Sequence, residues 1–248
     1  MLKVSIITVT FNSERTIVDC LRSIKSQTYS NIEHIVQDGG SFDGTVDIIE
    51  ENNLPNTKVF VEADDGIYDA LNKAIEKCSG DIIGILHSDD TYKNKYIVER
   101  VVGCFEDSTY SGVYGDLDHV LDPEGKRVFR HWKSKEFNRK LLKRGWMPPH
   151  PALFLRKEVF MKYGNYKTSF SISADYEFMI RILKAQDLKF KYVPEIMVNQ
   201  RVGGASNGNL KKFTIKLLED YRVIQEHSLG GLMVLFYKKL AKLGQFLW

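Results

Sequence analysis

The chain has 248 residues, of which 43% are apolar and 27% are charged, and its formal net charge is +3. This length and composition suit one large α/β domain, or two closely packed halves, and are not typical of a disordered protein. The charge is too small to indicate a nucleic-acid-binding protein, and the sequence has no arginine-rich block, so we expect no nucleic acid partner.

The cysteines and the N-terminus indicate the compartment. Cys20, Cys78 and Cys104 are odd in number and far apart, which favours reduced thiols over a disulfide framework or a zinc site. The first residues lead directly into a strand pattern without a cleavable leader, and no apolar run reaches the roughly 18 residues of a membrane span. We therefore expect a cytoplasmic protein, with at most peripheral contact to the inner face of the cytoplasmic membrane.

The first half of the chain alternates between strand and helix patterns. Apolar runs predict strands at residues 3–10, 32–38, 57–63 and 81–87. Amphipathic patterns predict helices at residues 13–27, 45–52, 67–78 and 94–105. Such alternation is typical of a mainly parallel sheet with helices on both faces, in which ligands bind at the carboxyl ends of the strands. The candidate ligand loops are then residues 8–12, 38–45, 63–68 and 87–92.

Beyond Gly115 the alternation breaks. Two strand patterns flank a turn at residues 122–125 and predict a β-hairpin. A proline-stiffened loop, a strand and a short helix follow at residues 146–160, and a helical pattern covers residues 173–185. Residues 188–207 return to strand and loop, and the remainder is mostly helical in pattern.

The stretch Gly84–Tyr92, with the sequence GILHSDDTY, ends a buried strand in two adjacent carboxylates. Asp89 and Asp90 could belong to a turn that caps the next helix, or to a divalent-metal site, because adjacent carboxylates repel unless a cation or donors share the site. Three of the four candidate loops carry acids, which supports a metal or nucleotide site. The GxGxxG and GxxxxGK[ST] fingerprints are absent, which argues against a Rossmann dehydrogenase and a P-loop NTPase.

Six segments together resemble the family 2 glycosyltransferases of the GT-A fold, most closely their bacterial polysaccharide-assembly subgroup. In the order of that family they are VSIITVTFN, DGGSFDGT, DDGIYDALNKAIEKCSGDIIGILHSDD, HPALFLRKEVF, ADYEFMIRI and RVGGASN. The resemblance covers about residues 4–207. It implies an α/β fold with a Rossmann-like nucleotide-binding half, a mixed but mainly parallel sheet, and C-terminal helices. The catalytic domain would span residues 1–208, with halves at 1–115 and 116–208, followed by a helical extension at 209–248.

The activity that the resemblance implies is inverting transfer of a sugar from a nucleotide-sugar, most often a UDP-sugar, to a saccharide acceptor in cell-surface polysaccharide assembly. The alternative on the same fold is a non-catalytic sugar-nucleotide or glycan-binding module. A nucleotidyltransferase is a third candidate, but its glycine-rich, basic first loop is absent. The resemblance further implies Mn²⁺ or Mg²⁺, with Asp90 as metal ligand and Asp89 as a ribose or metal contact. Further donor-site residues would be Thr8, Phe11, Asp38, Ser41, Asp65, Tyr68, Asn72 and Lys73.

Asp175 corresponds to the catalytic base of the family. An acceptor hydroxyl is a poor nucleophile at neutral pH, and a positioned carboxylate can take its proton. The alternative is an acid that only stabilises the first turn of its helix. His150 would line the acceptor or metal side, or be structural. Arg201, with Gly203, Gly204 and Ser206, would close over the donor diphosphate, or form a plain surface turn.

The chain departs from the family pattern at four positions. His87 stands where the metal motif usually has its first Asp, and Gly39 replaces a frequent second acid. Leu71 stands where an Arg often precedes Asn72, so Lys73 is expected to supply that charge, and Ala174 replaces the Glu before the base.

The C-terminal helix pattern carries an apolar stripe, formed by Leu232, Phe236, Leu240, Leu243 and Leu247. Lys238, Lys239 and Lys242 lie on or beside its edge. Two interpretations stay open. The stripe could bind an anionic membrane surface, which would suit a polyprenyl-diphosphate-linked acceptor, or it could pack on the catalytic domain or on a second copy of the chain in a homo-oligomer.

Overall fold

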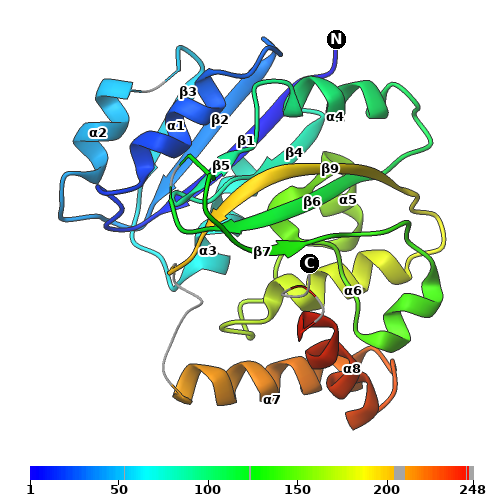
Figure 1. Cartoon of the computed structure of the whole chain (residues 1–248). Helices are drawn as coiled ribbons and strands as arrows, with labels where there is room; N and C mark the ends of the chain where they lie inside the picture. Colours follow the sequence, from blue (N-terminus) through cyan, green and yellow to red (C-terminus); the bar gives the residue numbers. More distant parts are fainter. Residues whose placement is uncertain (53, 123, 204–209, 244, 246–248) are drawn as a thin grey trace.

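The computed structural model describes residues 1–52, 54–122, 124–203, 210–243 and 245. Its centre is one mixed sheet with the strand order β3-β2-β1-β4-β8-β6-β9-β5, and β7 pairs with β6 (Figure 1). The strands are β1 (Val4–Thr10), β2 (Ile32–Asp38), β3 (Thr57–Val61), β4 (Ile82–Ile85), β5 (Asp90–Tyr92), β6 (Gly112–Val120), β7 (Val128–Trp132), β8 (Leu153–Arg156) and β9 (Phe190–Arg201).

The α-helices are α1 (Ile17–Lys25), α2 (Thr45–Asn52), α3 (Ile67–Lys77), α4 (Ile97–Phe105), α5 (Lys157–Tyr163), α6 (Ala174–Lys184), α7 (Leu210–Glu226) and α8 (Leu232–Leu243). Two short 3₁₀ helices, η1 (Arg139–Arg144) and η2 (His150–Ala152), precede β8.

The first half of the sheet is parallel. β1 pairs in parallel with β2 and β4, and β2 pairs in parallel with β3. β1 and β2 are buried over their whole length, although their sequences, VSIITVT and IEHIVQD, mix apolar with polar residues. The register pairs Thr10 with Asp38, so the loops that follow β1 and β2 leave the sheet side by side. This half has the nucleotide-binding topology that the sequence predicts.

The second half of the sheet mixes the two directions. β8 pairs antiparallel with β4 and β6, whereas β6 and β9 are parallel. The predicted hairpin is confirmed, because β6 and β7 pair antiparallel. Since β8 joins β4 directly, one sheet runs through both halves of the chain.

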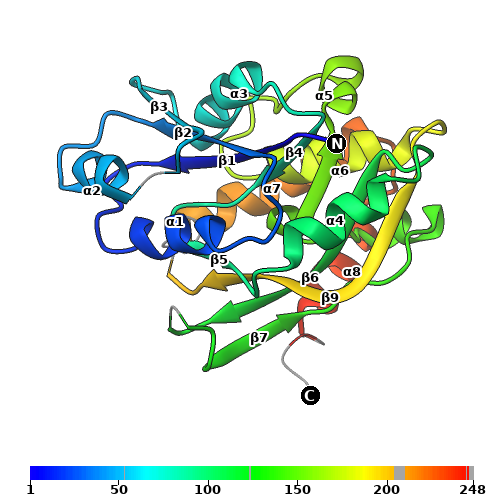
Figure 2. The ribbon, with the colours of Figure 1, turned by 90° about the horizontal axis from the view of Figure 1, so that it is seen from above.

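Helices cover both faces of the sheet (Figure 2). Buried side chains of α1 and α4 pack on one face, and those of α3, α5 and α6 pack on the other. The C-terminal helices lie beyond α6 on the side away from the sheet (Figure 1). They continue the same core through Val223 and Ile224 of α7 and Val234 and Leu235 of α8. None of the helices in these described ranges combines the length and apolar character that crossing a bilayer needs.

The start of α4 is one of the predicted boundaries that are wrong. The helix expected from residue 94 begins at Ile97, with Tyr96 as its N-cap, and Asp90–Tyr92 instead forms β5 against β9. The reason is tertiary: the partner strand is about a hundred residues further along the chain, so no local pattern shows the pairing. Neither Asp89 nor Asp90 therefore caps α4.

Candidate active site

Hydrogen bonds join the loops at the carboxyl ends of β2, β1 and β4. The Asn12 N–H donates to Ser41 Oγ at 2.8 Å, which links the loops after β1 and β2. Ser13 Oγ lies 3.0 Å from Ser88 Oγ, which links the loops after β1 and β4. Three of the four loops singled out in the sequence thus form one connected edge.

Asp38 organises the loop after β2. Its Oδ1 accepts the N–H groups of Gly40 and Ser41 at 2.9 and 2.7 Å, and its Oδ2 accepts the Ser41 hydroxyl at 2.6 Å. The side chain is fully buried. Gly40 has a φ of +88°, a conformation that glycine adopts without strain. The carboxylate therefore shapes this loop from within.

Asp64 fills the space beside Gly39. A Cβ on Gly39 would lie 2.5 Å from the Asp64 carboxylate and 3.4 Å from the Phe11 ring. The ring of Phe11 is 55% exposed and meets Phe42 edge to face at 5.9 Å. The sequence pointed to Asp65 in this loop, but Asp65 is exposed, and it is Asp64 that faces the loop after β2. The sequence feature that could have indicated Asp64 is Gly39, because a position without a side chain leaves room for an acid from another loop.

Thr8 lies beneath this edge rather than on it. It has no exposed surface, and its hydroxyl lies 2.9 Å from His34 Nε2 and 3.7 Å from Cys20 Sγ. Burial lowers the pKa of His34 to about 3, so the ring is neutral at pH 7. The predicted ligand contact of Thr8 is untested, and its visible contacts are structural.

Asp89 and Asp90 occupy different environments. Asp90 has no exposed surface, its Oδ2 accepts Gln200 at 3.4 Å, and its Oδ1 has no hydrogen-bond partner in the part of the chain that the structure describes. Burial, with the charge of Asp89 adding to it, raises the pKa of Asp90 well above its ordinary value. Asp89 is partly exposed and makes no hydrogen bond or ion pair within the described residues. Of the two carboxylates, only Asp89 is open to a ligand.

A chain of polar contacts leads from β4 to α6. His87 Nε2 lies 3.0 Å from His150 Nε2, and His150 Nδ1 lies 3.5 Å from Asp175 Oδ2. Burial lowers the pKa of His150 to about 4 and also lowers that of His87, so both rings are neutral at pH 7. One ring must then donate to the other. The sequence noted His87 only as a departure from the family, whereas the structure shows it contacting His150 directly.

Asp175 sits in the first turn of α6, and its side chain is 16% exposed. Burial raises the pKa of Asp175, but His150, Lys216 and Lys238 outweigh it, so the net pKa lies below the ordinary value. Asp175 Oδ1 lies 3.2 Å from the Tyr68 hydroxyl, which donates to the Ile172 carbonyl at 2.8 Å. Burial and the Asp175 charge raise the pKa of Tyr68. Asp175 is therefore an ionised carboxylate that can accept a proton.

Two predicted donor contacts point elsewhere. The Asn72 amide bonds the backbone of Tyr166 in both directions at 2.9 Å. Lys73 Nζ donates to the Ala63 carbonyl at 2.9 Å and pairs with Asp69 at 2.8 Å. These contacts hold loops around α3, and neither side chain lies with the three linked loops in this structure.

Arg201 ends β9 close to the two aspartates. β9 pairs with β5 so that Gln200 lies opposite Asp90. Arg201 Nη2 pairs with Asp19 at 2.9 Å, while its buried Nε has no hydrogen-bond partner among the described residues. Gly204 and Ser206 lie outside the described residues.

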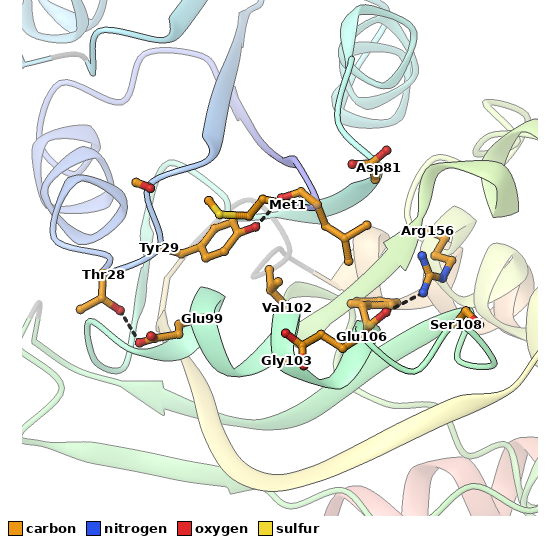
Figure 3. Close-up of a pocket in the computed structure, with 13 residues that line it drawn as sticks. Met1, Thr28, Tyr29, Asp81, Glu99, Val102, Gly103, Glu106, Ser108 and Arg156 are labelled. Carbon is orange, nitrogen blue, oxygen red and sulfur yellow. Dashed lines mark hydrogen bonds between the residues drawn. The ribbon is translucent and has the colours of Figure 1, made fainter.

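A separate cavity is lined by other residues (Figure 3). Its volume is about 1000 Å³, and its lining includes Leu2 and Asp81, which precede β1 and β4, together with Tyr29, Glu99 and Arg156. It therefore opens at the amino ends of the central strands, opposite the edge where parallel sheets bind ligands. The Arg156 guanidinium donates to the Tyr110 and Phe105 carbonyls, so this cation is already satisfied.

The acids fit a divalent ion only in part. No three His, Cys, Asp or Glu side chains converge as a metal cage in the part of the chain that the structure describes. Asp90 nevertheless carries a buried oxygen without a partner, and Asp89 presents a free carboxylate next to it. Hard cations prefer such oxygen ligands. The residues present suit an ion that takes its remaining ligands from a bound molecule.

Comparison with known proteins identifies the family. Residues 5–164 match Glycosyl transferase family 2. The PGL/p-HBAD biosynthesis glycosyltransferase of Mycobacterium bovis is 31% identical over 219 residues, covering 86% of this chain and 83% of the relative. The chondroitin synthase of Escherichia coli is 28% identical, and the match covers 95% of this chain but only 34% of that enzyme.

Solved structures agree on the fold. S. aureus TarS 1-349 in complex with UDP-GlcNAc superposes with a TM-score of 0.69 at 19% identity, covering 90% of this chain and 66% of that one. This chain spans 43% of the longer TarS structure. The mannosyltransferase PcManGT of Pyrobaculum calidifontis, in complex with GDP-Man and Mn²⁺, gives 0.67 at 16% identity, covering 99% of this chain and 72% of that one. The sheet order, the linked strand-end loops and the family match agree, and the chain belongs to glycosyl transferase family 2, with the GT-A fold.

Proposed function

We propose that the protein is an inverting glycosyltransferase that moves a sugar from a UDP-sugar to a saccharide acceptor, with Asp175 as the general base. The observation that supports this proposal most directly is the ionised Asp175 carboxylate at the start of α6. It is joined through His150 to His87 at the end of β4. This chain of contacts puts the proton acceptor next to the strand-end loops. The UDP-GlcNAc complex of TarS and the position of these loops support a UDP-sugar as donor.

The donor would lie across the three linked loops. The exposed Phe11 ring offers a stacking face for the base, and the loop shaped by Asp38 and Ser41 offers polar atoms for the ribose. The Arg201 guanidinium at the end of β9 suits a diphosphate oxygen. Asp65, Tyr68, Asn72 and Lys73 stay predictions as donor contacts.

The proposal includes a divalent cation. Asp89 would hold it directly, and Asp90 would hold it once its unpartnered Oδ1 is exposed. When bound, such an ion neutralises charge on the departing nucleoside diphosphate. The Mn²⁺ complex of PcManGT supports this part of the proposal.

Asp175 would take the proton of the attacking hydroxyl. Its lowered pKa keeps it ionised at neutral pH, and the contacts with Tyr68 and His150 fix its orientation. The hydroxyl would attack the anomeric carbon on the face opposite the leaving diphosphate, which inverts the configuration.

We place the acceptor at a membrane surface, as a lipid-linked saccharide in glycan assembly at the inner face of the cytoplasmic membrane. The exposed face of α8 supports this proposal, and it is formed by Leu232, Met233, Phe236, Tyr237 and Leu240. Three residues of the predicted stripe are thus exposed, while α8 packs inward through Val234 and Leu235. Lys238 does not border the exposed face as predicted, because its ammonium is buried against Asp220. The side chains of Lys242, Leu243 and Leu247 lie outside the described residues.

The test begins with UDP-, GDP- and dTDP-sugars, with and without Mn²⁺, scored by nucleotide release and by transfer to octyl glycosides. Asp175→Asn keeps the shape of the side chain and removes the proton acceptor, so transfer should fall by about 10²-fold or more while UDP binding stays unchanged. Glu158→Gln is the matched control, because Glu158 is an exposed first-turn acid of α5. NMR of the product should show an inverted anomeric centre.

Near-normal transfer by Asp175→Asn would contradict the role of the base. A wild-type chain that binds UDP but releases nucleotide from no donor would favour the non-catalytic binding module.

A further inference from the structure

Glu219 of α7 holds the loop that starts α6. Its Oε1 accepts the N–H and the hydroxyl of Ser171 at 2.7 and 2.8 Å. Its Oε2 accepts the N–H groups of Ile172 and Ser173 at 2.9 and 2.8 Å. One carboxylate thus satisfies three consecutive backbone donors, and hydrogen bonds to a charged acceptor are stronger than neutral ones.

This loop is in contact with the proposed base. Ser173 is the N-cap of α6, and Asp175 follows two residues later. The Ile172 carbonyl accepts the Tyr68 hydroxyl at 2.8 Å, and the same hydroxyl lies 3.2 Å from Asp175 Oδ1. A shift of the loop would therefore move both the backbone that carries Asp175 and the tyrosine that contacts it.

A second acid of α7, Asp220, also contacts the first turn of α6. Asp220 has no exposed surface, and its Oδ1 accepts the Ser173 hydroxyl at 2.9 Å. The same oxygen pairs at 2.8 Å with Lys238 of α8, whose ammonium lies 3.0 Å from the centre of the Tyr176 ring. The buried pair ties α7, α8 and the first turn of α6 together.

We propose that Glu219 and Asp220 are positioning residues for Asp175, so that the C-terminal helices form part of the catalytic centre. This inference rests on the proposed role of Asp175 as the base. Neither acid touches the reacting atoms; they act by fixing the loop that aims the carboxylate. Small misplacements of a catalytic group can lower the rate by about 10²-fold. A positioning role therefore explains why these helices carry buried charged groups, where apolar residues could give comparable stability.

The experiment is a double-mutant cycle on the whole chain, with the UDP-sugar that wild type uses fastest. Glu219→Ala should lower kcat by about 10-fold or more, since a general base contributes about 10²–10⁴-fold, and leave UDP affinity within about twofold of wild type. The same substitution added to Asp175→Asn should cause no further loss, because a residue that acts through the base has nothing left to position. Glu226→Ala is the control on the same helix, since within the described residues Glu226 pairs with the Lys167 and Arg222 side chains and not with the loop that starts α6.

The outcomes separate the two proposals. If Asp175→Asn keeps normal transfer, the base assignment itself fails. If Asp175→Asn is impaired but folded Glu219→Ala keeps a normal kcat, or if the two losses multiply in the double variant, the positioning role is overturned. Glu219→Gln keeps one carbonyl oxygen and should recover part of the kcat. Loss of UDP binding in both Glu219 variants would show that Glu219 holds the whole fold, which also overturns the proposal.

Discussion

The buried pair of Lys238 and Asp220 gives a stability prediction with a pH signature. Lys238→Met keeps the length of the side chain but leaves the Asp220 carboxylate without its partner at 2.8 Å. The Ser173 hydroxyl at 2.9 Å, Lys239 at 3.7 Å and the charge of Lys216 then remain near it. Removing one partner of a buried pair typically costs about 3–5 kcal/mol.

Protonation of Asp220 sets an upper limit to the stability that Lys238→Met loses. In the folded variant, burial raises the pKa of Asp220, whereas in wild type Lys238 and Lys216 outweigh burial and hold it below its ordinary value. Neutralising an acid of ordinary pKa about 3.9 costs about 4 kcal/mol at pH 7 and about 1.5 kcal/mol at pH 5. The folded variant binds a proton that its unfolded chain lacks, so its deficit relative to wild type shrinks as the pH falls.

Urea denaturation followed by circular dichroism at pH 7 and pH 5 measures both values. The burial-lowered pKa of Lys238, about 7, leaves the ammonium protonated at pH 5 in wild type. Lys239→Met is the control and should cost less than about 1 kcal/mol, because Lys239 is partly exposed and more distant. The double variant Lys238→Met/Asp220→Leu should recover most of the loss. Equal deficits at the two pH values, or a Lys239→Met deficit as large as that of Lys238→Met, would refute this reasoning.

Two further predictions test packing and membrane contact. Gly84→Ala should lower the free energy of unfolding by about 1–3 kcal/mol in urea denaturation, because the new Cβ would lie 2.5 Å from the buried Phe154 ring. Gly103→Ala on α4 is the control and should be neutral or stabilising, because its new Cβ would have nothing within 4 Å. Equal effects of the two substitutions would contradict the clash. The double variant Phe236→Ser/Leu240→Ser should release the protein from vesicles that contain anionic lipid. Its melting temperature should stay near that of wild type, since both side chains are exposed. Unchanged flotation with the vesicles would argue against membrane contact through α8.

The parallel half of the sheet was predictable because its cause is local. β1 and β2 carry buried apolar residues such as Ile6, Ile7 and Ile35, and each strand is followed by a polar loop. The direction of the strands then puts those loops on one edge. What the runs do not show is which way a polar side chain within a strand points. Thr8 was predicted as a ligand contact, yet it faces His34 and Cys20 in the helix-covered interior.

The two adjacent aspartates show a second limit. Their adjacency was consistent with a turn or a cation site, but it does not show which of the two carboxylates is exposed, and Asp89 lies in the turn before β5. Which of the two is buried depends on β5, and β5 exists only because β9 pairs with it. Asp90 is consequently enclosed and Asp89 exposed, a difference that no pattern within residues 84–92 contains.

The C-terminal helices show why the spacing of apolar residues alone does not identify the buried face of a helix. The predicted apolar stripe was open to two interpretations, membrane contact or packing on protein, and its members Leu232, Phe236 and Leu240 are exposed. The face that packs includes Lys238, because an ammonium can be buried when a carboxylate from another helix neutralises it, and Asp220 does so. Such a pair joins residues that look like surface charges in each helix alone. This pair contacts the first turn of α6, where Asp175 lies, through the Ser173 hydroxyl and the Tyr176 ring, so a contact that the sequence did not predict supports the backbone of the proposed base.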